Sequence, residues 1–92
     1  MKLFWTGPAR QDRRLIYQHI EADNPRAALM LDDVFSAKAA RLIETPCLGR
    51  PGVVDGTREL VAHRNYVLVY DVRPDRVRIL RVLHVARQWP AS

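Results

Sequence analysis

The sequence predicts an α+β fold, in which a helical hairpin packs on a small antiparallel sheet in the order β-α-α-β-β-β. Apolar residues recur at helical spacing up to about Glu44, and after Gly56 they alternate with a period of two, as in strands. The 92 residues suit one hydrophobic core. We therefore expect a single domain that spans residues 1–92.

The first half is expected to contain one strand and two helices. Residues 2–5 form a short apolar strand that ends at Thr6-Gly7-Pro8, and residues 8–22 continue as an amphipathic helix with a narrow apolar stripe. Asn24-Pro25 supplies an N-cap and a first-turn proline for a second helix that runs to about Glu44. Because the connection between them is so short, the two helices should form an antiparallel hairpin.

The second half is expected to contain a loop and three strands. Residues 45–56 form the loop, because they hold five Pro or Gly residues. Strands follow at residues 57–62, 65–72 and 76–84, and the middle one is apolar on both faces. Such a strand lies at the centre of a sheet and is covered on both sides. The place of the first strand in this sheet stays open.

The N-terminal region and the single cysteine indicate a cytoplasmic protein. Only three apolar residues follow Lys2 before a Gly-Pro breaker, which is too few for a signal peptide. No apolar run approaches the roughly 18 residues that a membrane span requires. Cys47 has no second cysteine with which to form a disulfide, so we expect a free thiol.

No cofactor and no metal are expected. The three histidines, His19, His63 and His84, are scattered along the chain, and there is no Gly-rich phosphate loop. The acidic pair Asp32-Asp33 lies inside the second helix, where it should belong to a solvated face.

Basic charge is concentrated in the second half of the chain. Residues 1–46 hold seven Lys/Arg against six Asp/Glu, whereas residues 47–92 hold eight against four, so the halves carry net charges of +1 and +4. Thirteen of the fifteen basic residues are Arg, whose planar fork matches phosphate and carboxylate geometry. A nucleic-acid, ribosomal or acidic-protein partner is compatible with this charge. A genome whose codon usage favours Arg is the alternative explanation.

Six short motifs, in order along the whole chain, resemble the RelE/ParE family of toxins. They are Ala9-x-x-Asp12-x-x-x-Ile16, Asn24-Pro25-x-Ala27-Ala28, Pro46-x-x-Gly49-Arg50, Gly56-Thr57-Arg58-Glu59-Leu60, Tyr66-Val67-Leu68-Val69-Tyr70 and Val82-Leu83-His84-x-x-Arg87. The resemblance implies the toxin component of a type II toxin–antitoxin system, encoded on a chromosome or plasmid and neutralised by a cognate antitoxin protein. It leaves the target open, because fold alone does not decide function.

The family divides into two branches with different targets. RelE-like members are ribosome-dependent mRNA interferases, and ParE-like members inhibit DNA gyrase. RelE-like enzymes usually carry an Arg in the central strand, and Val67 occupies that place here. A valine cannot stabilise the charge of a phosphorane, so this departure favours the ParE-like branch. Besides the mRNA interferase, a third possibility is an interaction module that binds the antitoxin but is no longer toxic.

The resemblance also names candidate residues at the target-facing site. If the protein is a metal-independent endoribonuclease, the catalytic candidates are His84, Arg58 and Arg87. Residues that would contact either target are Arg58, Arg81, Arg87 and Trp89. The plainer alternatives are that His84 hydrogen-bonds backbone and that Arg58-Glu59 is a solvated pair.

A second candidate site is the outer face of the second helix. Leu29, Met30, Ala37 and Ala40 lie off its main apolar stripe, where a small domain has little means to bury them. We expect an amphipathic antitoxin helix to pack there. A second antitoxin segment, acidic and extended, is expected at the basic half of the chain.

Overall fold

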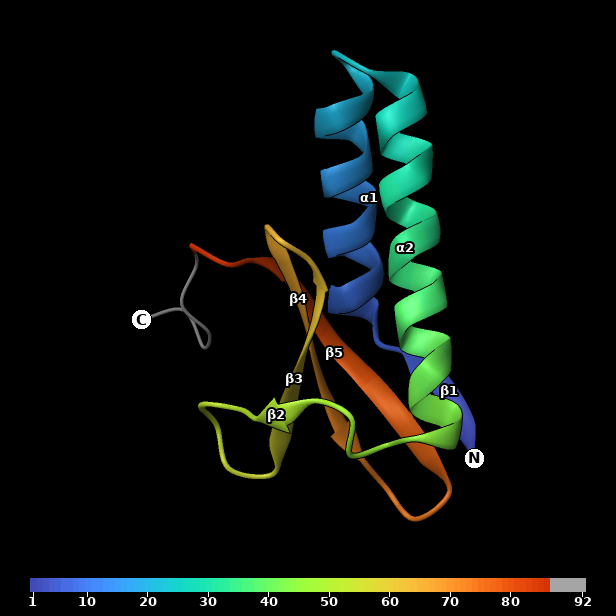
Figure 1. Ribbon diagram of the computed structural model, residues 1–92, viewed down its shortest axis with the longest axis vertical. Helices are drawn as coiled ribbons and strands as arrows, with labels where there is room; N and C mark the ends of the chain where they lie inside the picture. The colour runs from blue at the N-terminus through green and yellow to red at the C-terminus, as the bar shows by residue number, and fades with distance from the viewer. Residues whose placement is uncertain (87–92) are drawn as a thin grey trace.

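The computed structural model describes residues 1–86 and places two helices against one face of a five-stranded sheet (Figure 1). The helices are α1 (Gly7–Glu21) and α2 (Pro25–Glu44). The strands are β1 (Lys2–Trp5), β2 (Arg50–Pro51), β3 (Thr57–His63), β4 (Tyr66–Val72) and β5 (Arg76–His84). The α+β architecture and the helical hairpin are confirmed. The two-residue strand β2 lies inside the expected loop and was not predicted.

Both helices begin at the capping residues that the sequence indicates. The Thr6 side chain accepts a hydrogen bond from the Ala9 N–H at 3.3 Å, and the Asn24 side chain accepts one from the Ala27 N–H at 3.1 Å. Each cap satisfies a backbone donor that the first turn of a helix leaves unpaired. A proline follows in the first turn of each helix, where its missing N–H costs nothing.

The sheet has the strand order β1-β5-β4-β3-β2, so the first strand of the chain lies beside the last. β1 pairs with β5 in parallel, with Leu3 opposite Val77 and Trp5 opposite Ile79. The remaining neighbours are antiparallel. The antiparallel arrangement expected for the last three strands is confirmed, and β1, whose place the sequence left open, adds a parallel pair that makes the sheet mixed. A parallel pair needs a long crossover, and the chain between β1 and β5 supplies it.

The main hydrophobic core lies between α2 and the sheet. It contains Leu31, Phe35, Ala39 and Leu42 from the helix and Leu68, Tyr70, Val77, Ile79 and Val82 from the strands. A smaller cluster lies on the other face of the sheet and consists of Val67, Val69 and Leu83. The expectation that the central strand is covered on both sides is thus confirmed for β4.

None of the helices in residues 1–86 is long and apolar enough to cross a membrane.

The helical hairpin is joined by Arg13 of α1. Its guanidinium donates to the Asp32 carboxylate at 3.0 Å, to the Asp32 carbonyl at 3.1 Å and to the Ser36 hydroxyl at 2.8 Å. It also lies 4.3 Å from the centre of the Trp5 ring, within the range of a cation–π contact. Asp32 therefore forms an ion pair with Arg13 between the two helices, which corrects the expectation that it belongs to a solvated face. Asp33 is exposed, as expected.

We predict that Arg13→Met lowers the free energy of unfolding by roughly 1–3 kcal/mol, because it removes three hydrogen bonds of a charged donor and a cation–π contact together. The matched control is Arg14→Met on the neighbouring, exposed position of α1. Urea denaturation followed by circular dichroism measures both. Equal losses in the two variants would show that Arg13 contributes no more than a surface charge.

Candidate functional site

The described candidates for the target-facing site lie on two strands, β3 and β5. Arg58 is on β3, Arg81 is on β5, and His84 is the last residue of β5. Arg87 and Trp89 fall outside the described residues. Each of the first three side chains has a definite set of contacts, which decides how much of it can face a partner.

Arg58 holds the loop that leads from α2 into β2. Its guanidinium donates to the Gly49 carbonyl at 2.6 Å. The buried Tyr70 hydroxyl accepts the Gly49 N–H at 2.9 Å and donates to the Pro46 carbonyl at 2.7 Å. A Cβ at Gly49 would lie 2.7 Å from the Glu59 carbonyl and 2.8 Å from the Tyr70 ring, so only glycine fits here. The motif Pro46-x-x-Gly49 is therefore explained by a loop anchor.

The same contacts correct one expectation about the Arg58-Glu59 pair. The two side chains are not a solvated pair with each other: Glu59 pairs with Arg50 at 3.2 Å, and Arg58 bonds the loop backbone. Burial raises the pKa of the Tyr70 phenol, so this hydroxyl stays protonated and able to donate.

Arg81 forms a bidentate ion pair with Asp12 of α1. Its Nε and a terminal nitrogen donate to the two carboxylate oxygens at 2.7 Å and 2.9 Å. The same carboxylate accepts the Val82 N–H at 2.9 Å. The hydrogen bond to Asp12 holds the pKa of the Arg81 guanidinium above its ordinary value. Arg81 is thus a structural partner of Asp12, and its fork is already occupied.

The contacts of Asp12 also explain why α1 starts where it does. The paired positions of β1 end at Trp5, opposite Ile79, so the outer edge of β5 loses its strand neighbour there. Thr6 donates its N–H to the Ile79 carbonyl at 3.1 Å, and Asp12 accepts the Val82 N–H. The first two turns of α1 therefore take over from β1 in satisfying the backbone of β5.

Most arginines of the basic second half are paired within the chain. Of the seven at positions 47–86, five contact carboxylates: Arg50, Arg73, Arg76, Arg78 and Arg81. The strongest geometry after Arg81 is the fork of Arg78 on Asp71, at 2.9 Å and 2.6 Å. That hydrogen bond holds the pKa of the Asp71 carboxyl below its usual value. The net charge is unchanged, but few of these guanidinium groups are without an internal acceptor.

His84 stands beside a cleft of about 310 Å³ between α1 and the ends of β4 and β5. Its Nδ1 accepts the Ala86 N–H at 3.1 Å, and its ring meets Tyr66 edge to face at 5.3 Å. The cleft is lined by Asp12, Leu15, Ile16, His19, Tyr66, Val82, Leu83 and His84. The expected backbone hydrogen bond is therefore present, while the side chain stays exposed.

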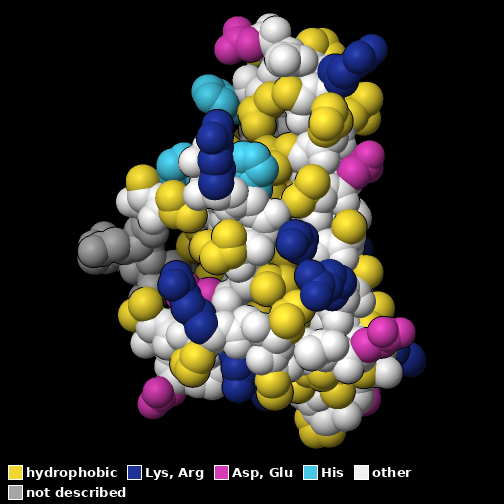
Figure 2. Space-filling view, in the orientation of Figure 1, with side chains coloured by type: hydrophobic (Ala, Val, Ile, Leu, Met, Phe, Trp, Pro, Cys, Tyr) yellow, Lys and Arg dark blue, Asp and Glu magenta, His cyan; other side chains and the backbone are white. Residues whose placement is uncertain are grey.

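The fold brings the histidines closer than their spacing in the sequence suggests. His19 and His84 line the same cleft, and His63 lies 6.2 Å from Tyr66, centroid to centroid. Figure 2 shows the three histidine side chains in one region of the surface. Even so, residues 1–86 contain no group of three His, Cys, Asp or Glu side chains that could hold a metal ion.

Val67 occupies the place of the central-strand Arg and is 9% exposed. It packs with Val69 and Leu83 on the face of the sheet away from the helices. Within residues 1–86, this part of the sheet surface is an apolar cluster, with Arg81 turned to Asp12. The sequence correctly indicated the missing cation, but it did not indicate that Arg81 is also engaged.

The outer face of α2 has the exposure that its sequence predicts. Leu29 and Met30 are 56% and 63% exposed, and Ala37 and Ala40 are exposed as well. Ile43, near the end of α2, is also exposed, at 36%. These five exposed apolar side chains lie along the outer side of α2, with the exposed Asp33 between Met30 and Ala37, and we call this surface the α2 face.

The helical hairpin on a small sheet, with motif residues at the loop anchor and at the edge of β5, is the architecture that the resemblance to RelE/ParE toxins implies. The family model of the ParE toxin of the type II toxin–antitoxin system parDE matches residues 3–89, and the chain belongs to this family.

Two known proteins show the same relationship. A protein of Sinorhizobium fredii (strain NBRC 101917 / NGR234) named "Putative toxin Y4kP" is 38% identical over 90 residues, which cover 97% of this chain and 93% of the relative. A solved chain of the chromosomal ParDE TA system from P. aeruginosa is 29% identical with a TM-score of 0.83. That match covers 92% of this chain and 96% of the other.

We predict that Asp12 and Arg81 are energetically coupled. Asp12→Ala and Arg81→Ala should each destabilise the fold. The double variant should lose about 1–3 kcal/mol less than the sum of the two single losses, because the second change removes a group that has already lost its partner. Urea unfolding of the four proteins completes the cycle. Additive losses would show that Arg81 is free to act elsewhere.

Proposed function

We propose that this ParE-family toxin arrests growth in the cytoplasm by ParE-like inhibition of DNA gyrase, and that a cognate antitoxin neutralises it. The observation that carries the proposal is the apolar cluster around Val67, where an mRNA interferase would place an arginine. Membership of the ParE family points to the same branch.

The chemistry of RNA cleavage supports this choice. Attack by the 2′-hydroxyl needs a base, an acid for the leaving oxygen, and cations that stabilise the phosphorane. Of the candidates in the described part of the chain, His84 alone is exposed, and its imidazole is the one side chain among them suited to be an acid or a base. Arg58 donates to the Gly49 carbonyl and Arg81 to Asp12, so neither guanidinium is free to stabilise a phosphorane without breaking a contact of the fold.

A contact with gyrase makes fewer demands on the site, because binding needs complementary surface rather than a catalytic set. We expect the surface to include Arg87, Trp89, the exposed His84 and the cleft that His84 lines. Trp and Arg are the residue types most enriched where binding energy concentrates.

The alternative is a RelE-like mRNA interferase, and one observation favours it. His84, His19, Tyr66 and Asp12 line one cleft, which combines titratable and aromatic side chains of the kind that act on RNA. In that case His84, Arg58 and Arg87 would be the catalytic residues.

We predict that the purified protein inhibits gyrase supercoiling and leaves mRNA intact in a translating extract. Arg87→Ala or Trp89→Ala should relieve growth arrest by removing target contacts, while antitoxin binding stays near normal. The control is Arg64→Ala, an exposed arginine in the β3–β4 turn. Codon-dependent cuts that disappear in His84→Ala would establish the interferase instead.

We predict that the antitoxin places an amphipathic helix on the α2 face. Met30→Asp should abolish binding of the corresponding antitoxin fragment, since it puts a charge at the centre of an apolar contact. Gln18→Asp, at an exposed position of α1, makes a similar charge change away from this face. Isothermal titration measures both. Unchanged affinity of Met30→Asp would remove the α2 face as the docking site.

A further inference from the structure

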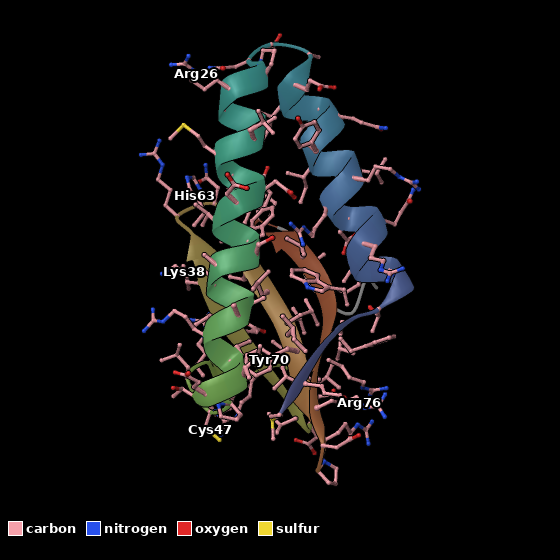
Figure 3. All side chains as sticks on the ribbon, turned by 90° about the vertical axis from the view of Figure 1, so that its right-hand side faces the viewer. Arg26, Lys38, Cys47, His63, Tyr70 and Arg76 are labelled. Carbon is pink, nitrogen blue, oxygen red and sulfur yellow. The ribbon has the colours of Figure 1, made fainter. Side chains whose placement is uncertain are left out.

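The cleft between α1 and β5 contains a short piece of backbone that faces no strand. β1 ends at Trp5, and Figure 3 shows α1 starting there and running on beside the upper part of β5. The Val85 N–H donates to the Asn65 carbonyl at 2.8 Å, on the side of β4. Backbone groups alternate in direction along an antiparallel strand. The N–H and C=O groups of Val82 and His84 therefore point away from β4, towards the cleft.

Asp12 satisfies only one of these backbone groups. Its carboxylate accepts the Val82 N–H at 2.9 Å, whereas no hydrogen bond within residues 1–86 reaches the Val82 carbonyl or the His84 N–H. These two groups have the spacing of a parallel strand pair, in which one partner residue donates to the first and accepts from the second. Both residues line the cleft. The cleft therefore offers backbone pairing to one residue of an extended chain.

The side chains of the cleft determine which partner residue fits. Its apolar walls come from Leu15, Ile16, Val82 and Leu83. The Asp12 carboxylate is already engaged by Arg81 and by backbone, so it is not free to bind a cation. The exposed imidazoles of His19 and His84 supply N–H donors.

The hydrogen bond of His84 fixes the direction of its donor. Because Nδ1 accepts the Ala86 N–H at 3.1 Å, the ring proton lies on Nε2. Tyr66 forms a further wall, held by edge-to-face contacts with Phe35 at 5.6 Å and with His84 at 5.3 Å. Free donors with apolar walls suit a carboxylate on an aliphatic stem, as in glutamate.

A second copy of the chain does not offer such a segment. Five of the ten carboxylates form ion pairs within the chain, namely Asp12, Asp32, Glu59, Asp71 and Asp75. The other five lie on helices or in turns, namely Glu21, Asp23, Asp33, Glu44 and Asp55. No strand of residues 1–86 therefore carries an acidic side chain that is free to enter the cleft.

We infer that the cleft binds an extended, acidic segment of gyrase. The backbone of this segment pairs with β5 at Val82 and His84, and its carboxylate contacts the imidazoles of His19 and His84. The inference rests on the proposed function and adds the chemistry of the contact. The cleft adjoins the proposed target-facing residue His84, whereas the antitoxin helix is proposed for the α2 face, on the other helix.

Two exposed leucines provide a matched pair of variants. Leu15 lines the cleft and is 53% exposed, and Leu29 lies on the α2 face and is 56% exposed. Leu15→Asp should weaken the binding of gyrase by about tenfold or more, because it places a like charge beside the acidic segment, and should leave antitoxin binding near normal. Leu29→Asp should do the reverse. Isothermal titration with purified gyrase and with the antitoxin measures both, and thermal melting checks that each variant folds.

The outcomes of this pair are distinguishable. Unchanged gyrase binding by Leu15→Asp would overturn the inference while gyrase inhibition stands. Loss of antitoxin binding in its place would assign the cleft to the antitoxin and would also overturn the inference. No gyrase binding by the wild-type toxin would refute the proposed function and this inference with it.

Two substitutions of nearly equal size at His19 test the charge of the bound side chain. His19→Gln keeps an N–H donor and should change gyrase affinity by less than about threefold. His19→Glu replaces the donor by an anion and should weaken binding by about tenfold at low salt and less at high salt. Equal affinities of the two variants would show that the segment in the cleft is not acidic.

Amide hydrogen exchange tests the backbone pairing without a substitution. In the free toxin the His84 amide should exchange much faster than the Leu83 amide, which points towards β4. Bound gyrase should protect His84, with Leu83 as the internal control. If the His84 amide exchanges equally fast in the free and bound toxin, the pairing of a gyrase segment with β5 is wrong.

Discussion

The carboxylate of Asp12 is the group on which the arrangement of helices and sheet depends. Past Trp5, strand β5 has no strand neighbour on its outer side, and an unpaired buried backbone group costs free energy comparable to a lost hydrogen bond. The Asp12 carboxylate accepts hydrogen bonds from the Val82 N–H and from two nitrogens of the Arg81 guanidinium. One side chain therefore joins α1 to the edge of β5. This contact sets where α1 lies, and α2 follows because the hairpin connection is short and Arg13 links the helices.

Two arginines that the sequence analysis named as candidates for target contact belong to this framework. Arg58 stabilises the loop at Gly49, and Arg81 completes the contact with Asp12. The place of Arg58 in the motif Gly56-Thr57-Arg58-Glu59-Leu60 is therefore explained by the fold as readily as by function. The surface that faces the target has to be sought among side chains without such internal contacts, which is why the exposed His84 carries more weight than either arginine.

Local patterns predicted most of the fold, and long-range pairing accounts for what they missed. The amphipathic stripes and caps gave α1 and α2 to within one or two residues, and the alternation in residues 76–84 matched β5. The place of β1 could not be predicted, because parallel pairing with β5 depends on partners more than 70 positions away, as the Thr6–Ile79 bond at a separation of 73 illustrates. The Asp12–Arg81 pair, at a separation of 69, was hidden for the same reason, although both residues were singled out. The absence of an arginine at position 67 could be predicted to matter from the sequence alone, because a valine carries no charge whatever its neighbours are.

The parallel pairing of β1 with β5 has a consequence for the order in which the protein can form. β1 is synthesised before β5, so its backbone has no strand partner until β5 has also left the ribosome. Contacts so distant in sequence slow folding, because a long loop must close before they form. Until then Thr6 and Asp12 have no strand edge to contact, and α1 has nothing that holds it against the sheet. In a nascent chain, the contacts that hold α1 at the edge of the sheet can therefore form only after β5 has been synthesised.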